Sequence, residues 1–319
     1  MLQEHAPCKV AFIGAGHMAR EHARALLDVP GVQLAGICSR SRAKAEAMGA
    51  EFGMPLVCAS IAELHERTGA DLVVIAVPEL EVSRVACESF AYPWTALIEK
   101  PAGYDVADAE RIEAAARERR RTAFVALNRR HYGSTRAVLH ELSAVPGPRL
   151  IKVVDQEDPA AALQSGRPRL VTDNWMYANS IHMIDFFKIF ARGNITSVER
   201  IIPWTPAQPR YVAAKIAFDS GDIGLYEAVW NAPGPWAVSV NTPDKRWEMR
   251  PVEKATVQLA GQRSVAALAD DPWDALYKPG LRRQAEQAVA GARGQAVDLP
   301  TLSDALETMR LTQSIYKAG

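Results

Sequence analysis

The chain has 319 residues, with 37 basic and 37 acidic side chains and a formal charge of zero. Hydrophobic residues make up 48% of the chain and charged residues 23%, which is enough apolar material for folded cores and excludes a largely disordered protein. The charge balance argues against nucleic acids or membrane surfaces as general partners, because such binding usually needs a basic excess. A chain of this length is expected to form two domains.

Neither a membrane span nor a secretion signal is visible. No apolar stretch approaches the roughly 18 residues of a span, and the first residues, with Glu4 and His5, lack an apolar signal core. We therefore expect a cytoplasmic protein. The cysteines are Cys8, Cys38, Cys58 and Cys87. They form no CxxC pair, which indicates buried reduced thiols, and we expect no metal site.

Short apolar runs alternate with helical patterns in the first part of the chain. Strands are predicted over residues 9–13, 32–38, 71–77, 96–99 and 122–127. Helices are predicted from the end of the first strand to about 27, over 41–52 and from Asp105 to about 121. The run at 71–77 is continuously apolar, which is typical of a strand covered on both faces. This order predicts a doubly wound parallel sheet over residues 1–127.

The second part, residues 128–319, has a different character. Residues 211–218 and 223–229 flank a polar turn and predict a hairpin, with two more strands over 238–240 and 246–249. Helical patterns return at 281–290 and 303–316, and a helix over about 303–317 is a candidate to pack back on the first domain. We expect an α/β domain with a mostly antiparallel open sheet, whose outer face is a candidate interface of a homodimer or homotetramer.

Glycines follow the first predicted strand. Gly14, Gly16 and Ala19 fit the pattern G-x-G-x-x-G/A, in which the glycines permit a tight turn and close approach of a pyrophosphate. The start of the following helix supplies free N–H groups and a partial positive charge. We expect a Rossmann domain that binds a dinucleotide, with His17 and Met18 as further contacts. The alternative is a tight turn without a ligand.

The end of the second predicted strand indicates which cofactor is bound. An acid at this position binds the ribose hydroxyls of NAD, but the chain has Ser39 and Arg40 here and no acid before Glu46. Serine and arginine can bind a 2′-phosphate that a carboxylate would repel. The sequence therefore favours NADP(H) over NAD(H). Alternatively, the arginines here only solvate the start of a helix.

Further segments carry a family resemblance. Val77-Pro78 ends one strand, Glu99-Lys100-Pro101 follows another, Asn128-Arg129-Arg130 follows the last strand of the first domain, and His182-Met183-Ile184-Asp185 lies in a helical pattern. Together with the glycine loop, this order resembles the glucose–fructose oxidoreductase, inositol dehydrogenase and related (Gfo/Idh/MocA) family. The resemblance implies an NAD(P)-dependent oxidoreductase of the CH–OH class, which moves a hydride to or from a carbon of a sugar or nucleotide sugar.

The resemblance also implies roles for single residues. Lys100 corresponds to a lysine whose ammonium stabilises the developing alkoxide, and His182 to a histidine that relays the proton. The implied cofactor contacts are Val77, Pro78, Glu99 and Lys100. The implied substrate contacts are Lys100, Arg129, Asn179 and His182. The alternatives are a surface lysine and a histidine satisfied in a helical core.

One position departs from the family pattern. Many members carry an aspartate one helical turn before the histidine, where this chain has Ala178. Acid–base work would then fall to His182, Lys100 or Tyr177. The alternative for Tyr177 is an aromatic packing residue, as is usual for a Trp175/Tyr177 pair. The departure leaves two other functions open: a nicotinamide-dependent reductase of a non-sugar carbonyl or imine, and a non-catalytic NAD(P)-binding regulator.

Overall fold

The computed structural model describes residues 6–207 and 210–317 and divides the chain into two compact units. Unit 1 comprises residues 1–128 and 275–306, and unit 2 comprises residues 129–274 and 307–319. By its position in the chain, segment 275–306 is predicted to lie in the second domain, but its apolar side chains complete a core of unit 1 instead. The prediction that the amino terminus lacks a signal core concerns residues 1–5 in part, and these lie outside the described residues.

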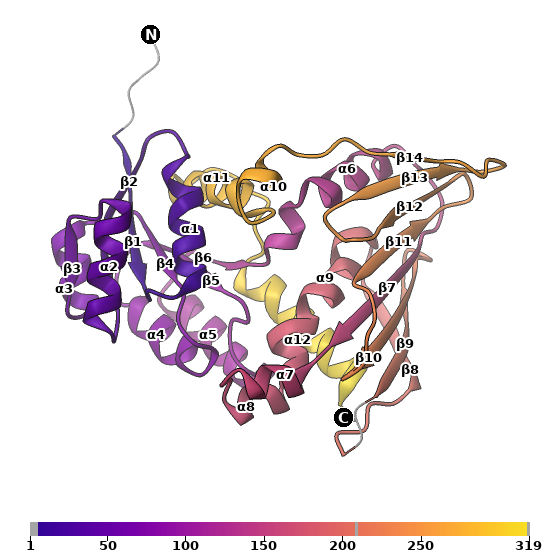
Figure 1. The fold of residues 1–319 in the computed structure, drawn as a ribbon, viewed down its shortest axis with the longest axis horizontal. Coiled ribbons are helices and arrows are strands. Elements are labelled where there is room, and N and C mark those ends of the chain that lie inside the picture. The colour runs from indigo at the N-terminus through magenta and orange to yellow at the C-terminus, as the bar shows by residue number, and fades with distance from the viewer. Residues whose placement is uncertain (1–5, 208–209, 318–319) are drawn as a thin grey trace, which may run out of the picture. The chain divides into compact units, whose positions relative to one another are not determined.

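Unit 1 is built on a parallel sheet with strand order β3-β2-β1-β4-β5-β6 (Figure 1). The strands are β1 (Cys8–Ile13), β2 (Val32–Cys38), β3 (Leu56–Cys58), β4 (Leu72–Ile75), β5 (Thr95–Glu99) and β6 (Ala123–Ala126). The strand order reverses between β1 and β4, and in such sheets ligands bind beyond the carboxyl ends of the strands at this reversal. The predicted Rossmann class of unit 1 is confirmed.

Helices cover both faces of this sheet. One face carries α1 (His17–Leu27), α2 (Arg42–Phe52) and α11 (Leu281–Ala292), and the other carries α3 (Ile61–Thr68), α4 (Val82–Ser89) and α5 (Val106–Glu118). Because side chains alternate along a strand, Val10 and Phe12 pack on the first group, while Ala11 and Ile13 pack on the second. Asp105 caps α5 by accepting a hydrogen bond from the Asp108 N–H, as predicted.

The cysteines lie in unit 1 as free thiols. Cys8, Cys38 and Cys58 are buried and Cys87 is half-buried. Burial raises the pKa of both the Cys8 and the Cys38 thiol to about 11, which makes these thiols poorly reactive at neutral pH.

Unit 2 contains an eight-stranded sheet with the order β14-β13-β12-β11-β7-β10-β9-β8. The strands are β7 (Leu150–Glu157), β8 (Ile195–Ile202), β9 (Tyr211–Phe218), β10 (Ile223–Trp230), β11 (Ala237–Asn241), β12 (Lys245–Met249), β13 (Ala255–Leu259) and β14 (Val265–Ala267). All neighbouring pairs are antiparallel except β7 and β10. The predicted hairpin forms β9 and β10, so the expected mostly antiparallel sheet is confirmed.

Apart from the short helix η1 (Glu79–Glu81), the remaining helices lie after the first domain in sequence. They are η2 (Asn128–His131), α6 (Gly133–Leu142), α7 (Pro159–Gln164), α8 (Arg169–Asp173), a π-helical turn η3 (Met176–Ser180), α9 (Ile181–Phe190), α10 (Trp273–Leu276) and α12 (Leu302–Tyr316). The apolar helix α9 packs against β7, which buries Ile151 and Val153 on the inner face of the sheet. Helix α12 begins in unit 1 and ends in unit 2.

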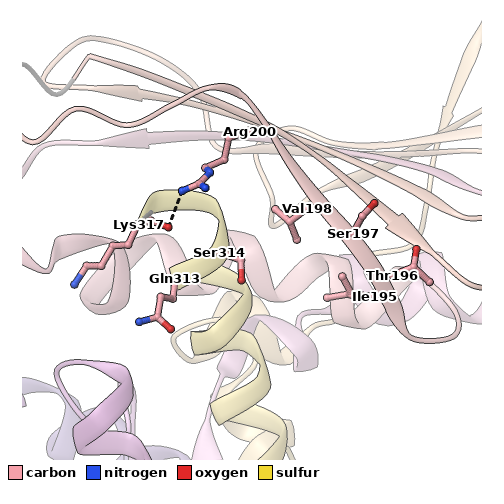
Figure 2. Close-up of a pocket in the computed structure, with 8 residues that line it drawn as sticks. All are labelled: Ile195, Thr196, Ser197, Val198, Arg200, Gln313, Ser314 and Lys317. Atoms are coloured by element: carbon pink, nitrogen blue, oxygen red, sulfur yellow. Dashed lines mark hydrogen bonds between the residues drawn. The ribbon is translucent and has the colours of Figure 1, made fainter. Parts of the chain in front are cut away.

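A groove of about 520 Å³ lies between β8 and the end of α12 within unit 2 (Figure 2). It is lined by Ile195, Thr196, Ser197, Val198, Arg200, Gln313, Ser314 and Lys317. The Arg200 guanidinium donates a hydrogen bond to the Lys317 carbonyl at 2.7 Å. None of the residues predicted to bind cofactor or substrate lines this groove, so it is not the candidate site.

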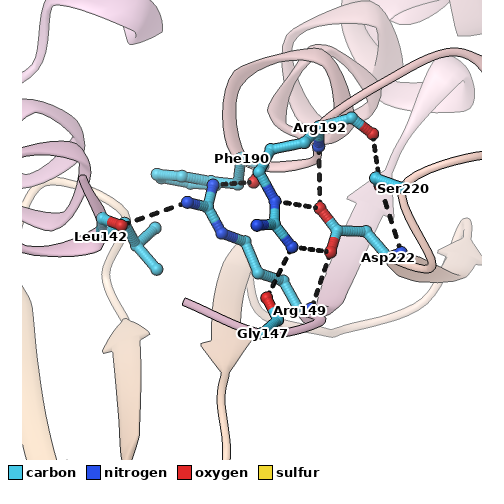
Figure 3. Close-up of polar contacts among 7 residues, drawn as sticks. All are labelled: Leu142, Gly147, Arg149, Phe190, Arg192, Ser220 and Asp222. Atoms are coloured by element: carbon cyan, nitrogen blue, oxygen red, sulfur yellow. Dashed lines mark hydrogen bonds and ion pairs between the residues drawn. The ribbon is translucent and has the colours of Figure 1, made fainter. Parts of the chain in front are cut away.

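Three charged residues, Arg149, Arg192 and Asp222, tie several elements of unit 2 together (Figure 3). We call them the Asp222 cluster. The Asp222 carboxylate accepts hydrogen bonds from the Arg192 guanidinium at 3.1 and 2.7 Å and from the backbone N–H groups of Arg149 and Arg192 at 2.8 Å each. The Arg149 guanidinium donates to the carbonyls of Phe190 and Leu142, at the ends of α9 and α6. Burial opposes ionisation of Asp222, but these hydrogen bonds outweigh it and hold the pKa of Asp222 below its usual value.

Candidate functional site

The glycine loop joins β1 to α1, as the sequence predicts. Gly14 has a φ of +109°, and a Cβ at this position would lie 2.1 Å from the Ala76 carbonyl oxygen, so only glycine fits. Gly16 precedes α1, and a Cβ there would meet no atom within 4 Å. Helix α1 has no side-chain cap and no acidic residue in its first turn. The N-terminus of α1, which carries the positive end of the helix dipole, therefore lies beside open space, and such an environment suits a phosphate group.

The other predicted cofactor residues of unit 1 lie along the same edge of the sheet, because the carboxyl ends of parallel strands meet there. The half-buried Ser39 and the exposed Arg40 follow β2, and Val77 and Pro78 follow β4. His17 is exposed and Met18 half-buried at the start of α1, while Ala19 is fully buried against the sheet. The residues present therefore fit an extended dinucleotide.

Arg40 has an acidic partner that was not predicted. Its Nη1 lies 3.0 Å from Oε1 of Glu81, which ends the short helix η1 (Glu79–Glu81) after β4. The two residues are 41 positions apart, so no local sequence pattern links them. The sequence offers one indication of this ion pair, which is that acidic residues follow the apolar strand β4. Strands β2 and β4 lie on opposite sides of β1, so the segments that follow them start at the same edge of the sheet.

Glu99, predicted as a cofactor contact, is bound to α1. Its Oε1 lies 2.6 Å from Nε2 of His22, and both side chains are buried. Lys100 follows directly and is half-buried at the end of β5. The helix that starts at the glycine loop is therefore connected by one buried hydrogen bond to the segment that carries Lys100.

The predicted substrate residues of unit 2 lie on η3 and α9. His182 is the second residue of α9 and is 8% exposed. Tyr177 is buried, and the Lys317 ammonium lies 5.2 Å from the centroid of its ring, which suits the packing interpretation. The half-buried Asn179 donates its amide to both oxygens of Glu157, at 3.1 and 2.9 Å.

Asp155 and Glu157 form a buried pair of carboxyl groups on the inner face of β7. Tyr226 Oη donates to Asp155 Oδ2 at 2.7 Å, and Trp175 Nε1 donates to Glu157 Oε2 at 2.6 Å. Burial, and secondarily the charge of Asp155, raises the pKa of Glu157 well above its usual value. Neither residue is among the predicted site residues. The available signal is that two residues separated by one position in a strand point to the same face of the sheet.

The Arg129 side chain contacts two other side chains of unit 2. Its Nη1 lies 2.6 Å from the Met183 sulfur, and its guanidinium carbon lies 4.7 Å from the ring centroid of Trp236. The neighbouring Arg130 forms a two-pronged ion pair with Asp185 at 2.7 Å for each bond. These contacts anchor the start of unit 2 on α9.

The predicted site residues thus fall into two sets. Unit 1 contains the cofactor residues and Lys100, and unit 2 contains Arg129, Tyr177, Asn179 and His182. Over residues 6–207 and 210–317, no three His, Cys, Asp or Glu side chains form a group that could hold a metal ion. Within the same ranges, no helix is both long and apolar enough to span a bilayer.

The fold of unit 1 and its glycine loop define a dinucleotide-binding α/β protein. Residues 8–127 match the family described as an oxidoreductase family with an NAD-binding Rossmann fold, known as Gfo/Idh/MocA. For these residues, which make up the predicted first domain, the match confirms the resemblance noted in the sequence.

Individual proteins are similar to this chain over different shares of its length. The inositol 2-dehydrogenase of Streptomyces avermitilis is 36% identical over 124 residues, which is 38% of this chain and 36% of that protein. The chain thus matches only about a third of the length of this relative. The 4-carboxy-2-hydroxymuconate-6-semialdehyde dehydrogenase of Sphingobium sp. is 24% identical over 236 residues, 71% of this chain and 73% of that protein. The aldose–aldose oxidoreductase of Caulobacter crescentus, solved with glycerol, superposes with a TM-score of 0.82 over 98% of this chain and 97% of that chain, at 16% identity, which shows a shared fold.

Proposed function

We propose that the chain is an NADP(H)-dependent oxidoreductase that transfers a hydride to or from a carbon of a sugar or nucleotide sugar. The observation that carries the proposal is the uncapped start of α1 beside Gly16, followed along the same sheet edge by Ser39 and Arg40. The sugar class is supported by the family match and by relatives named for inositol and aldoses.

Unit 1 holds the cofactor in this proposal. A bound nicotinamide supplies or accepts the hydride. The backbone at Gly14 and Gly16 and the first turn of α1 bind the pyrophosphate, while Ser39 and Arg40 bind the 2′-phosphate. The further contacts are His17, Met18, Ala19, Val77, Pro78, Glu99 and Lys100.

We assign the acid–base chemistry of the reaction to Lys100 and His182. The Lys100 ammonium stabilises negative charge on that oxygen, and His182 orients the hydroxyl and relays its proton. Arg129 and Asn179 line the substrate side. Tyr177 is a weaker candidate for proton transfer, because its ring is buried beside the Lys317 ammonium.

The first test is a fluorescence titration with NADPH and NADH, followed by hydride-transfer assays on sugars and nucleotide sugars. We expect tighter binding of NADPH and turnover of at least one sugar. A Ser39→Asp variant should lose the preference for NADPH, because the new carboxylate repels the 2′-phosphate. Preference of the unchanged protein for NADH would contradict the cofactor assignment.

A Lys100→Ala variant tests the catalytic assignment. Turnover should fall by about 10²–10⁴-fold, the usual contribution of a general acid or base, while NADPH affinity stays within about twofold. Lys9→Ala is the matched control, because Lys9 is an exposed lysine of the same unit on β1. Full turnover by Lys100→Ala would show that this lysine is dispensable.

Ala178 motivates a second candidate function, a non-catalytic NAD(P)-binding regulator. Such a protein would bind the cofactor but show no stereospecific hydride exchange with any substrate of the panel. Turnover of ketones or imines, but not of sugars, would instead favour a reductase of non-sugar substrates. We further propose that the protein is cytoplasmic and forms a homodimer or homotetramer through the outer face of the unit 2 sheet.

A further inference from the structure

We propose that Glu81 sets the cofactor selectivity of this chain by competing with the 2′-phosphate for Arg40. This inference rests on the proposed function, in which Arg40 binds that phosphate. It concerns a residue of unit 1 that lies outside the glycine loop and outside the end of β2.

The position of Glu81 follows from the sheet topology. Strands β2 and β4 flank β1, and the glycine loop starts at the end of β1. The ion pair between Arg40 Nη1 and Glu81 Oε1, 3.0 Å long, therefore joins the segments after β2 and β4 across the end of β1. In this class of sheet, a dinucleotide passes over the same edge between its pyrophosphate and its adenosine.

The charges around Glu81 make the competition selective. Its second oxygen, Oε2, lies 3.1 Å from Nη2 of Arg84, so the carboxylate keeps a cationic partner when Arg40 moves away. NADPH brings a phosphate that recruits Arg40, and Arg40 can bind this phosphate only by giving up its ion pair with Glu81. NADH brings no phosphate at this position, so Arg40 and Glu81 stay paired. Glu81 therefore weakens the binding of NADPH and leaves NADH largely unaffected.

The magnitude of the effect is limited by exposure. The Arg40 side chain is 69% exposed and that of Glu81 is 29% exposed. Exposed ion pairs contribute at most about 1 kcal/mol, which corresponds to roughly a fivefold change in a dissociation constant. A phosphate can thus displace Glu81 from Arg40, and the effect of this competition decreases as ionic strength rises.

The test compares the full chain with its Glu81→Gln and Glu88→Gln variants in titrations with NADPH and with NADH at low salt. We expect Glu81→Gln to bind NADPH about three- to fivefold more tightly, with NADH affinity within twofold. Glu88 is the matched control, because it is a glutamate that forms an ion pair with the same Arg84, at 3.2 Å. Glu88→Gln should leave both affinities unchanged.

A double-variant cycle shows whether the effect passes through Arg40. In an Arg40→Ala background, Glu81→Gln should give no gain in NADPH affinity beyond about twofold. An equal gain with and without Arg40 would reduce Glu81 to a general repulsive charge and overturn the proposal. An unchanged ratio of the NADPH and NADH affinities in Glu81→Gln would overturn it as well.

The outcomes separate this inference from the proposed function. The proposed function is tested by the cofactor preference and the sugar turnover of the unchanged chain. The inference is tested by how the ratio of NADPH affinity to NADH affinity changes in the variants. A chain that prefers NADH but gains NADPH affinity on Glu81→Gln overturns the cofactor assignment and supports the inference. A chain that binds neither nucleotide overturns both.

Discussion

Two neighbouring carboxyl groups in the core of unit 2 cannot both be ionised at low cost. Asp155 and Glu157 are almost fully buried on β7, and burying an unpaired charge costs several kcal/mol. A proton on Glu157 relieves the repulsion. In that state the carboxyl still accepts hydrogen bonds from Trp175 and Asn179, so Glu157 holds the residues that lead into α9.

The pH dependence of stability should reveal this proton. Because the folded pKa of Glu157 lies well above the usual 4.5, its stabilising contribution is complete below about that pH and is lost as pH rises through the folded pKa. Glu157→Gln imitates the protonated form, so its melting temperature should fall less than that of the unchanged chain between pH 5 and pH 9. Thermal melts across this range measure the difference.

Glu227→Gln is the control for this experiment. Glu227 is an exposed glutamate on β10 that pairs with Lys152 at 3.0 Å, and its removal should not change the slope. Parallel stability curves for Glu157→Gln and the unchanged chain would mean that Glu157 is ionised in the folded protein.

Residue by residue, the sequence predicts groups whose chemistry is local and misses those whose partners are distant. The glycine loop is readable because strand, turn and helix are contiguous. The partners of Arg40, Glu99 and Asn179 lie 41, 77 and 22 residues away and depend on which strands become neighbours. The individual roles of Lys100 and His182 remain predictions that the variants above test.

Helix α1 and strand β5 are joined by the buried contact between His22 and Glu99. One end of α1 lies at the glycine loop, and β5 leads directly to Lys100. A misplacement of about 1 Å at a catalytic group can reduce the rate about 10²-fold. The hydrogen bond between these elements is therefore expected to position Lys100 relative to the cofactor.

Two substitutions of His22 separate this positioning role from a purely structural one. His22→Leu removes the donor and should lower kcat by roughly ten- to a hundredfold, with little change in the affinity for NADPH. His22→Gln keeps an N–H group and should restore most of the activity. Steady-state kinetics and cofactor titrations measure both effects. If His22→Gln were as impaired as His22→Leu, the hydrogen bond would not be what positions Lys100.

Among the elements, prediction succeeds where the hydrophobic pattern is regular. The predicted strand at 32–38 is β2 itself, and the hairpin of β9 and β10 agrees to within one residue. Strand β7 was not predicted. Its inner face reads Ile151, Val153, Asp155 and Glu157, so buried carboxyl groups interrupt the apolar alternation that identifies a strand.

On the scale of whole units, the hydrogen bonds of the Asp222 cluster connect α6, α9, the start of β7 and the turn before β10 within unit 2. Asp222→Asn should lower the free energy of unfolding by about 1–3 kcal/mol, because hydrogen bonds to a charged group are lost. It should leave NADPH affinity unchanged, because the residues proposed to bind the cofactor belong to unit 1. Chemical denaturation and cofactor titration check these two expectations.

The same substitution should change the acid limb of the stability curve. The folded pKa of Asp222 is lowered, so its contribution is present above the usual value of 3.8 and is lost as pH falls through the folded pKa. Asp244→Asn serves as the control, because Asp244 is an exposed aspartate of unit 2 in the turn between β11 and β12. An unaltered denaturation midpoint in Asp222→Asn would show that the cluster contributes little to stability.

The division of unit 1 into two stretches of chain affects how it forms during synthesis. A ribosome that has translated residue 128 has produced every strand of the parallel sheet but not α11, whose Leu281, Ala285 and Ala288 close the core beside α1. Residues 129–274 of unit 2 must emerge before those side chains arrive. Until then, one apolar face of the nascent sheet is incompletely covered and is a surface to which a chaperone can bind. For the same reason, a truncated chain ending at residue 128 would make a poor substitute for the intact nucleotide-binding domain.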